Sequence, residues 1–571
     1  MTIKRYRVVL ILSLTFSLIE SPFLLAGEKE DFALAKEAYE KDLFREAVSY
    51  LERFIVDYPQ SKRTDYCNLL LGISYLKLKR PKQALAKFQN ILLSFPKSSY
   101  REITSYYLAA SLYEASEFEE AERSFQDFLA EYPQSRYAES AYYALILSAL
   151  RLADLSQAMV WLEALKKSYP KSNSIAIGEK LIAYSCYQRG LDYYRRRDYS
   201  SALDDFRKVV STTKESSLLS NSFLKIGDIF FNRKKYKEAK DSYEKVISDF
   251  PISPAVPFAL FQLGNIYKKQ ENFKEARAIF EKIPLRFPKS ALIPESIYEV
   301  GLTFFREGDY LKAREKFEDI IEKFSPSELA KSALLQKGLC DYNEKEYQKA
   351  LHTFQEFIDK YPDHQLIGEA YYGAGSVLSR LGKKKGARET WIKGARVEPT
   401  SPLAPDLGLL VARSYFEEGK FDKAKSWFKE ILDHFPQSSS APEALYLLGV
   451  SLLKEERNEE AMVSFDRFLE IYPKGPLVSY VRREKGNLLM NQKEWQKAIK
   501  IFEKIPKENR ALYAESLFKG GECLQNLKRP EDALRSYLQI TAFCNDIAPW
   551  NKRADEAIAE LKKVAKDEIH R

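Results

Sequence analysis

The residue types that most often carry catalysis or bind metals are few in this chain, and their spacing fits no known site. Only four histidines occur among 571 residues, and none has a partner at metal-ligand spacing: His352, His364, His434 and His570. The motifs G-x-x-x-x-G-K-[ST], H-E-x-x-H and G-x-S-x-G are all missing from the sequence. We therefore expect no enzyme activity, no cofactor and no bound metal, and we interpret the histidines as surface or loop residues.

The five cysteines offer no better candidate for a reactive site. Their number is odd and no two form a C-x-x-C pair: Cys67, Cys186, Cys340, Cys523 and Cys544. This spacing excludes a disulfide framework and a zinc site of known type. We expect buried thiols that pack as small apolar residues.

Aromatic residues, in contrast, are abundant, with 36 Tyr and 35 Phe. Many belong to the motif aromatic-x-x-Ala-x-x-x-aromatic, as in FEEAERSF and YKEAKDSY. The alanine of this motif recurs every 37 residues, apart from one step of 44 and a last step of 35. It defines fourteen repeats, at Ala47, Ala84, Ala121, Ala158, Ala202, Ala239, Ala276, Ala313, Ala350, Ala387, Ala424, Ala461, Ala498 and Ala533.

Two further columns keep the same register. Twelve residues before the alanine stands Gly or Ala in every repeat except the fourth, which has Ile146. Twelve residues after it, ten repeats have a proline, often followed by x-Ser. With the alanine numbered position 20, the small residue is at position 8, the second aromatic at position 24 and the proline at position 32.

These columns predict two helices per repeat. Small residues at positions 8 and 20 let two helix backbones approach closely, and the aromatic at position 24 lies on the same face as the alanine. Proline ends the second helix because it lacks an N–H and cannot continue it. With 45% hydrophobic and 30% charged residues, the composition excludes a disordered chain and a multi-pass membrane protein.

Small, alanine, aromatic and proline columns in paired helices resemble the tetratricopeptide repeat (TPR) family. The resemblance covers residues 28–547 and implies an all-α, right-handed superhelical solenoid that binds proteins. The longer, 37-residue repeats with [FY]-P-x-S linkers are similar to those of bacterial cell-envelope members, among them the lipoprotein of the outer-membrane barrel-assembly machine and the Tol–Pal coordinator. This chain differs from them in having no lipid-acceptor Cys and many more repeats.

Breaks in the register suggest the domain boundaries. Repeats 1–4 occupy residues 28–170 and repeats 5–14 residues 171–547, because the 44-residue step inserts seven residues around Lys171 to Lys180. We interpret this insertion as a lengthened helix or a bend between two sub-solenoids. Residues 548–571 are charged and are expected to form a capping helix over the last repeat.

The first 26 residues resemble a secretory signal peptide. A basic stub of Lys4, Arg5 and Arg7 precedes an apolar stretch over residues 8–19, which is too short to span a bilayer. A cut after Ala26 is expected, and a short uncleaved anchor remains the alternative.

In the TPR family, positions 5, 9 and 12 of the first helix line a concave groove. Tyrosines dominate positions 5 and 12 here, and the candidate groove residues are Tyr106, Tyr113, Tyr143, Tyr187, Tyr194, Tyr298, Tyr372 and Tyr446. Such rings suit contact surfaces, although packing between neighbouring first helices would explain them equally. Family members that clamp a C-terminal carboxylate use Lys or Arg and Asn, which only Arg483, Asn487 and Lys519 partly match.

Several turns between paired helices carry clustered cations, as in Arg195-Arg196-Arg197 and Arg233-Lys234-Lys235. They are expected to be solvated, or to form a broken basic stripe for anionic lipid headgroups or an acidic partner. The modest net charge of +9 and the export signal argue against nucleic acid.

Together these features predict a periplasmic scaffold, peripheral to the outer membrane, that binds protein or peptide partners in cell-envelope assembly or maintenance. The alternative is a membrane-tethered or cytosolic TPR adaptor or co-chaperone, if the N-terminus is not cleaved.

Overall fold

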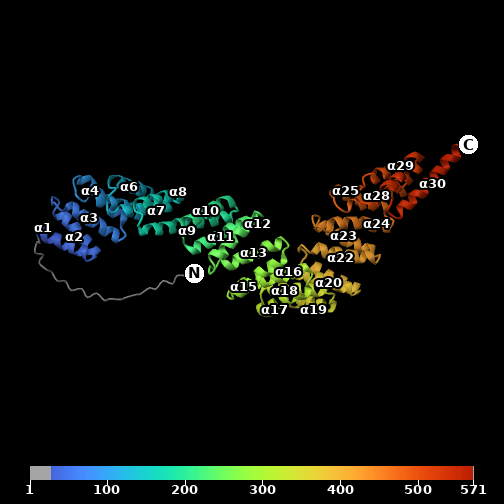
Figure 1. Ribbon diagram of the computed structural model, residues 1–571, viewed down its shortest axis with the longest axis horizontal. Coiled ribbons are helices and arrows are strands. Elements are labelled where there is room, and N and C mark those ends of the chain that lie inside the picture. Colours follow the sequence, from blue (N-terminus) through green and yellow to red (C-terminus); the bar gives the residue numbers. More distant parts are fainter. Residues whose placement is uncertain (1–26, 570–571) are drawn as a thin grey trace. The chain divides into compact units, whose positions relative to one another are not determined.

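The computed structural model describes residues 27–569 of this protein, and every regular element among them is a helix (Figure 1). The expected signal peptide with its cut at Ala26, and His570, lie outside the described residues. The chain divides into two compact units after Ile266, within the helix Val256–Lys269. The all-helical class expected from the repeats is confirmed.

The first unit contains the first six helix pairs and the start of the seventh. Its helices are α1 (Glu28–Glu40), α2 (Phe44–Asp57), α3 (Thr64–Lys77), α4 (Pro81–Ser94), α5 (Arg101–Glu114), α6 (Phe118–Glu131), α7 (Ala138–Arg151), α8 (Leu155–Ser168), α9 (Asn173–Arg195), α10 (Tyr199–Thr212), α11 (Ser216–Asn232), α12 (Tyr236–Asp249) and the beginning of α13 (Val256–Lys269).

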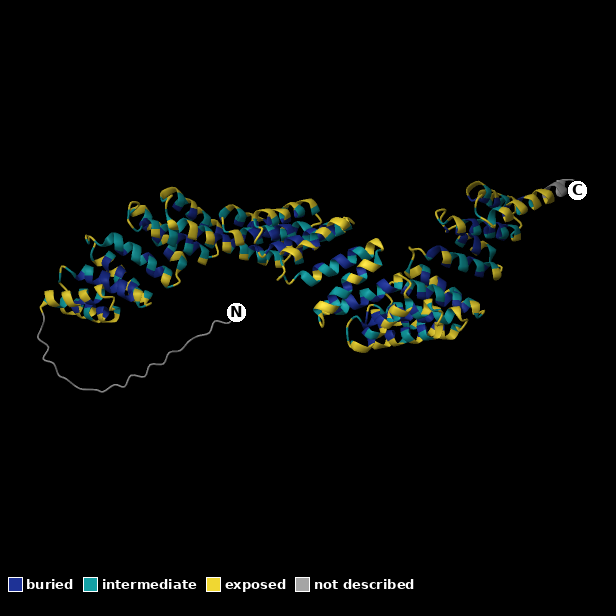
Figure 2. Ribbon diagram, turned by 60° about the horizontal axis from the view of Figure 1, so that its bottom comes forward, coloured by how far each residue is buried: buried dark blue, intermediate teal, exposed yellow. Residues whose placement is uncertain are grey.

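The second unit continues the same succession of helices. They are α14 (Phe273–Phe280), α15 (Lys282–Arg286), α16 (Ile293–Glu307), α17 (Tyr310–Phe324), α18 (Glu328–Asn343), α19 (Tyr347–Lys360), α20 (Ile367–Arg380), α21 (Lys384–Val397), α22 (Ala404–Glu417), α23 (Phe421–His434), α24 (Ala441–Lys454), α25 (Asn458–Ile471), α26 (Val478–Asn491), α27 (Trp495–Phe502), α28 (Arg510–Asn526), α29 (Pro530–Phe543) and α30 (Trp550–Ile569). Figure 2 shows buried residues where paired helices meet and exposed ones at the turns.

The core of most pairs is a contact between position 8 and the aromatic ring at position 24. A Cβ atom added to Gly72 would lie 2.5 Å from Cε1 of Phe88, and one added to Gly227 would lie 2.5 Å from Cε1 of Tyr243. Both rings are fully buried. At these two positions glycine avoids a clash, because the ring edge occupies the space of a Cβ.

The exception at Ile146 follows from the same contact. Position 24 of that repeat is Leu162 instead of an aromatic, and both side chains are buried. Repeat 1 likewise combines Ala35 with Leu51. A smaller residue at position 24 leaves room for a larger one at position 8.

The turn within each pair has one backbone conformation throughout. Position 15 has a positive φ in all fourteen repeats: Asp42, Lys79, Ser116, Ala153, Arg197, Lys234, Glu271, Gly308, Lys345, Gly382, Gly419, Glu456, Lys493 and Lys528. The next N–H reaches back five residues, as from Arg80 to the carbonyl of Tyr75 at 2.8 Å. This bond closes the end of the first helix.

In the first four repeats, the serine of the P-x-S linker fastens the linker to its own repeat. Ser98 Oγ donates to Asp65 Oδ2 at 2.6 Å and accepts from the N–H of Tyr100 at 3.2 Å. The same serine–carboxylate bond joins Ser61 to Glu28, Ser135 to Glu102 and Ser172 to Glu139. The end of a second helix is thereby tied to the start of its first helix.

The seven inserted residues lengthen α9, which runs for 23 residues. Arg189 on this helix donates two bonds of 2.7 Å to the buried carboxylate of Asp205 on α10. The boundary between sub-solenoids at residue 171 stays a prediction. At the other end, the Trp550 ring of α30 lies 5.5 Å from that of Phe518 on α28, and a capping role for residues 548–571 also stays a prediction.

The contact between positions 8 and 24 predicts a coupled pair of substitutions. Gly72→Ala should lower the free energy of unfolding, because overpacking costs about 1–3 kcal/mol and exceeds the gain of about 1 kcal/mol in helix propensity. With Phe88→Leu also present, Gly72→Ala should instead stabilise. Urea unfolding of the four variants measures this coupling, and simple additivity would contradict it.

The left-handed turns predict that glycine is the better residue at position 15. Ala153, with φ 58°, has no side-chain group that could offset the strain of this conformation. Ala153→Gly should therefore raise the free energy of unfolding by about 0.5–1 kcal/mol. Gly308→Ala is the matched control: its Cβ would meet nothing within 4 Å, so the opposite change reports backbone strain alone. Thermal unfolding tests both, and equal signs would refute the interpretation.

Candidate functional site

The expected groove tyrosines at position 5 lie half-buried on the first helices, apart from Tyr372, which is exposed. The ring of Tyr187 is 5.6 Å from that of Phe206, and Tyr298 is 5.4 Å from Phe317. These partners are the position-24 aromatics of the same repeat. The position-5 ring therefore packs with its inner side on the core of its own pair, and part of its surface stays accessible.

The hydroxyl groups of these tyrosines reach the next first helix. Ser140 lies close enough to Tyr106 to lower the pKa of that tyrosine, and Gln336 and Arg483 act in the same way on Tyr298 and Tyr446. Burial raises the pKa of Tyr106, Tyr298 and Tyr446, and of Tyr187. Tyr106, Tyr298 and Tyr446 thus have a polar side chain of the next repeat close to their hydroxyl groups.

The tyrosines at position 12 form a second row near the turns. The Tyr113 ring packs 5.3 Å from Phe118, and that of Tyr194 packs 5.7 Å from Tyr199. The Tyr194 hydroxyl accepts from Nδ2 of Asn232, one repeat further on, at 3.2 Å. This row also joins successive repeats.

Tyr372 and Tyr143 differ in how far they are exposed. Tyr372 is 41% exposed. Tyr143 is half-buried. Burial is the main cause that raises its pKa, and the nearby Tyr113 raises it further. The eight tyrosines are thus distributed along the first helices rather than gathered in one cavity, and their role in binding stays a prediction.

A charged pair beside Tyr194 was missed in the sequence. Lys225 Nζ lies 2.7 Å from Asp228 Oδ2 and 5.3 Å from the centre of the Tyr194 ring. Tyr243 donates to the other oxygen of Asp228 at 3.0 Å. Asp228 occupies position 9, so a search of all three groove positions for charge would have found it.

The residues that partly match a carboxylate clamp are already paired within the chain. Lys519 Nζ donates to Asn487 Oδ1 at 2.7 Å and to Glu515 Oε1 at 2.6 Å. Arg483 Nε donates to Glu484 at 3.1 Å. Any incoming carboxylate would have to compete with these two acids.

The turns of repeats 5 and 6 carry a cluster of exposed cations, which we call the basic turn patch: Arg196, Arg197, Arg233, Lys234 and Lys235. The two turns are neighbours, because Arg233 is among the groups that lower the pKa of Asp198, after its hydrogen bonds with Ser201. At another turn, Lys79 forms an ion pair with Glu114 at 3.2 Å.

The cysteines and histidines are placed as the sequence predicted. All five cysteines are free and buried, and burial raises the pKa of Cys67 to about 12. His352 and His434 are exposed on helices. His364 lies in a linker in place of the usual serine, 2.7 Å from Glu328. Within residues 27–569, no cluster of three potential metal ligands is found.

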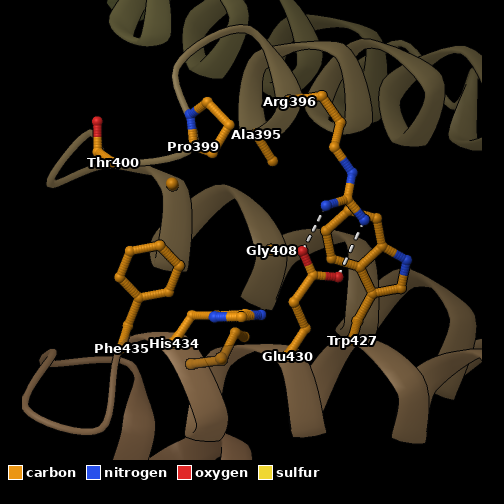
Figure 3. A pocket seen from close by; sticks show the side chains of 11 residues that line it. Ala395, Arg396, Pro399, Thr400, Gly408, Trp427, Glu430, His434 and Phe435 are labelled. Carbon is orange, nitrogen blue, oxygen red and sulfur yellow. Dashed lines mark hydrogen bonds and ion pairs between the residues drawn. The ribbon is translucent and has the colours of Figure 1, made fainter.

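A cavity of about 350 Å³ lies between α21, α22 and α23 (Figure 3). Arg396 donates to both carboxylate oxygens of Glu430, at 2.5 and 2.9 Å, and its guanidinium lies 4.7 Å from the centre of the Trp427 ring. Phe435 and Pro399 face this group from the other side. No motif in the sequence pointed to this cavity.

Comparison with protein families agrees with the helical pairs. The model of YfiO, an outer membrane lipoprotein family, matches residues 21–105, 76–154, 102–215 and 290–391, which together are more than half of the chain. Tetratricopeptide repeat models match residues 221–251, 258–290 and 409–476. The chain belongs to the tetratricopeptide repeat family. Its repeats over the YfiO matches are of the kind found in that lipoprotein family.

One solved structure with similarity to this TPR chain is a tetratricopeptide repeat protein from Parabacteroides merdae. The two sequences are 18% identical, the TM-score is 0.35, and the match covers 47% of this chain and 98% of that one. Naa15/Naa10 bound to HypK-THB has 12% identity, a TM-score of 0.35 and coverage of 95% and 97%. The Cut9–Hcn1 hetero-tetramer of the APC/C has 15% identity, a TM-score of 0.29 and coverage of 94% and 96%. A search of curated proteins finds no significant match. Among the described residues, no helix is both long and apolar enough to cross a membrane.

Proposed function

We propose that this TPR protein is an exported periplasmic scaffold that holds protein partners during assembly or maintenance of the cell envelope at the outer membrane. The observation that carries the proposal is the set of YfiO matches over more than half of the chain. TPR proteins act through protein contacts. The basic stub and short apolar run before Ala26 support export.

In this proposal, extended or helical segments of a partner dock along the first helices. The half-buried tyrosines offer ring surface, and Lys225 with Asp228 adds polar contacts beside Tyr194. Rings that are already held by neighbouring aromatics lose little side-chain entropy on binding. Of the eight candidates, Tyr372 is the most exposed, at 41%.

A second role is contact with an anionic membrane through the basic turn patch. Its five exposed cations project from two neighbouring turns. Lipid headgroups can meet such cations at the surface without entering a groove. Each such cation near an anionic surface contributes about 1 kcal/mol. A tethered or cytosolic adaptor remains the alternative if the N-terminus is retained.

Export predicts a mature chain that begins near Gly27. Mass spectrometry of the N-terminus, on protein from fractionated source cells, should find this species in the envelope or periplasmic fraction. An intact Met1 in the cytosolic fraction would contradict export and favour the adaptor.

Docking along the first helices predicts position-dependent photo-crosslinking. A benzophenone amino acid at Tyr143 or Tyr372 should capture a protein partner in cells, whereas one at Val160, exposed on the second helix α8, should not. Tyr143→Ala should then weaken binding of the captured partner by about 1–3 kcal/mol.

The folding control for this experiment is Gly227→Leu, which overpacks the core against Tyr243. Tyr143→Ala should lower the melting temperature far less than this control. Equal losses would show that the ring is core, and unchanged capture would exclude the groove.

The basic turn patch predicts binding to vesicles of phosphatidylglycerol and phosphatidylcholine, but not to phosphatidylcholine alone. Flotation should show loss of binding in a fourfold variant: Arg196→Gln, Arg197→Gln, Lys234→Gln and Lys235→Gln. The matched control removes the same charge from four separate exposed turns: Lys79→Gln, Lys345→Gln, Lys493→Gln and Lys528→Gln. Equal loss in both would indicate net charge alone and refute a localised patch.

A further inference from the structure

The cavity between α21, α22 and α23 exists because two of its wall residues are smaller than their equivalents in other repeats. The first is Ala395 at position 28 of repeat 10. The flanking repeats have Ile358 and Leu432 there, and Ala395 is the smallest residue of this column in the fourteen repeats. The repeat itself therefore shows what packing would fill the space.

The second small residue is Gly408 at position 4 of repeat 11. The flanking repeats have Tyr371 and Leu445 at this position. A Cβ atom on Gly408 would meet Ile431 at 3.4 Å and Trp427 at 3.5 Å, which is ordinary contact. No close approach of backbones requires glycine here, unlike at position 8. Gly408 thus loses helix propensity and packing without a structural reason in its own surroundings.

The lining of the cavity is mostly apolar, and the charges of Arg396 and Glu430 at its edge oppose each other. Ile431 and Ala395 are buried, and the Trp427 ring forms a wall. The exposed Arg396 guanidinium is held by both oxygens of Glu430 and by the Trp427 ring, so the pair presents a neutral edge (Figure 3). An uncharged apolar group would replace water there at low cost, whereas a charged group would lose hydration without a free partner.

The cavity is open on one side and small. Pro399, Thr400 and His434 at its margin are exposed, so a bound chain could continue into solvent and meet polar groups there. A volume of about 350 Å³ lies at the lower end of the range of about 300–1,000 Å³ for small-molecule sites. It suits one large side chain with its adjoining backbone.

We propose that this cavity binds one uncharged apolar side chain, aromatic or branched, of an extended segment of a partner protein. The proposal rests on the protein-binding function above, but on a different surface from the groove tyrosines. The cavity is a specificity pocket on the side of the second helices α21 and α23. Its occupant replaces the side chains that repeats 9 and 11 supply at position 28, and repeats 10 and 12 at position 4.

The test uses blocked amino acids as probes of the full-length protein. The methyl NMR signal of Ile431, assigned through Ile431→Val, reports on the cavity during titration with N-acetyl amides of Phe, Leu, Lys and Glu. Phe and Leu amides should shift this signal in a saturable way, and Lys and Glu amides should not. Equal shifts with the charged amides, or none with the apolar ones, would overturn the proposal.

A substitution that fills the cavity with leucine, the residue at position 4 of repeat 12, distinguishes an effect on binding from an effect on folding. Gly408→Leu should raise or maintain the melting temperature and weaken binding of the Phe amide at least about tenfold. Gly520→Leu is the matched control, because Gly520 lines a different cavity on α28, where its Cβ would meet nothing within 4 Å. It should leave the Ile431 titration unchanged. Unchanged binding in Gly408→Leu, or equal loss in Gly520→Leu, would refute the assignment to this cavity.

A last comparison distinguishes a protein segment from a free small ligand. The amide of N-acetyltryptophan should bind more tightly than indole, because its backbone groups reach the polar margin of the cavity. Tighter binding of indole would overturn the protein segment as the occupant. None of these results depends on crosslinking at Tyr143 or Tyr372, so the two proposals fail separately.

Discussion

The structure depends on the contact between a small residue at position 8 and a ring at position 24. In most repeats the ring edge occupies the place of a Cβ atom, as at Gly72 and Gly227, and the ring is fully buried. This contact sets the distance between the paired helices, and its regular recurrence lets each pair stack on the next. Where the ring is replaced by leucine, as at Leu162, the opposite residue can be as large as Ile146.

Residues outside that contact are free to differ between repeats, and the candidate binding surfaces arise there. Positions 5 and 12 keep one side of each tyrosine on the core and leave the other accessible. Positions 4 and 28 are large in most repeats and small at Gly408 and Ala395. In a repeat protein, a departure from a column that packing does not require is therefore a physical indication of a site.

Much of the fold could be predicted from the sequence because its signals are local and occur many times. Periodic Ala, Gly and Pro columns indicated the helix pairs, and the inserted residues near Lys171 indicated the long helix α9. Two local features were not predictable. The left-handed residue at position 15 is a Lys, Arg or Glu in most repeats, and the role of the linker serines needed carboxylates 33 residues earlier in the chain.

The sequence by itself determined the number of repeats, the helix pairs and the columns of their core, since those contacts join residues at fixed short spacings. Only the tertiary structure decided which variable residues meet across successive repeats. Arg396 and Glu430 are 34 residues apart, and neither they nor Trp427 belong to a column with a constant residue type. The cavity beside them results from missing side chains at Ala395 and Gly408, and such an empty space has no residue pattern of its own until the helices are packed.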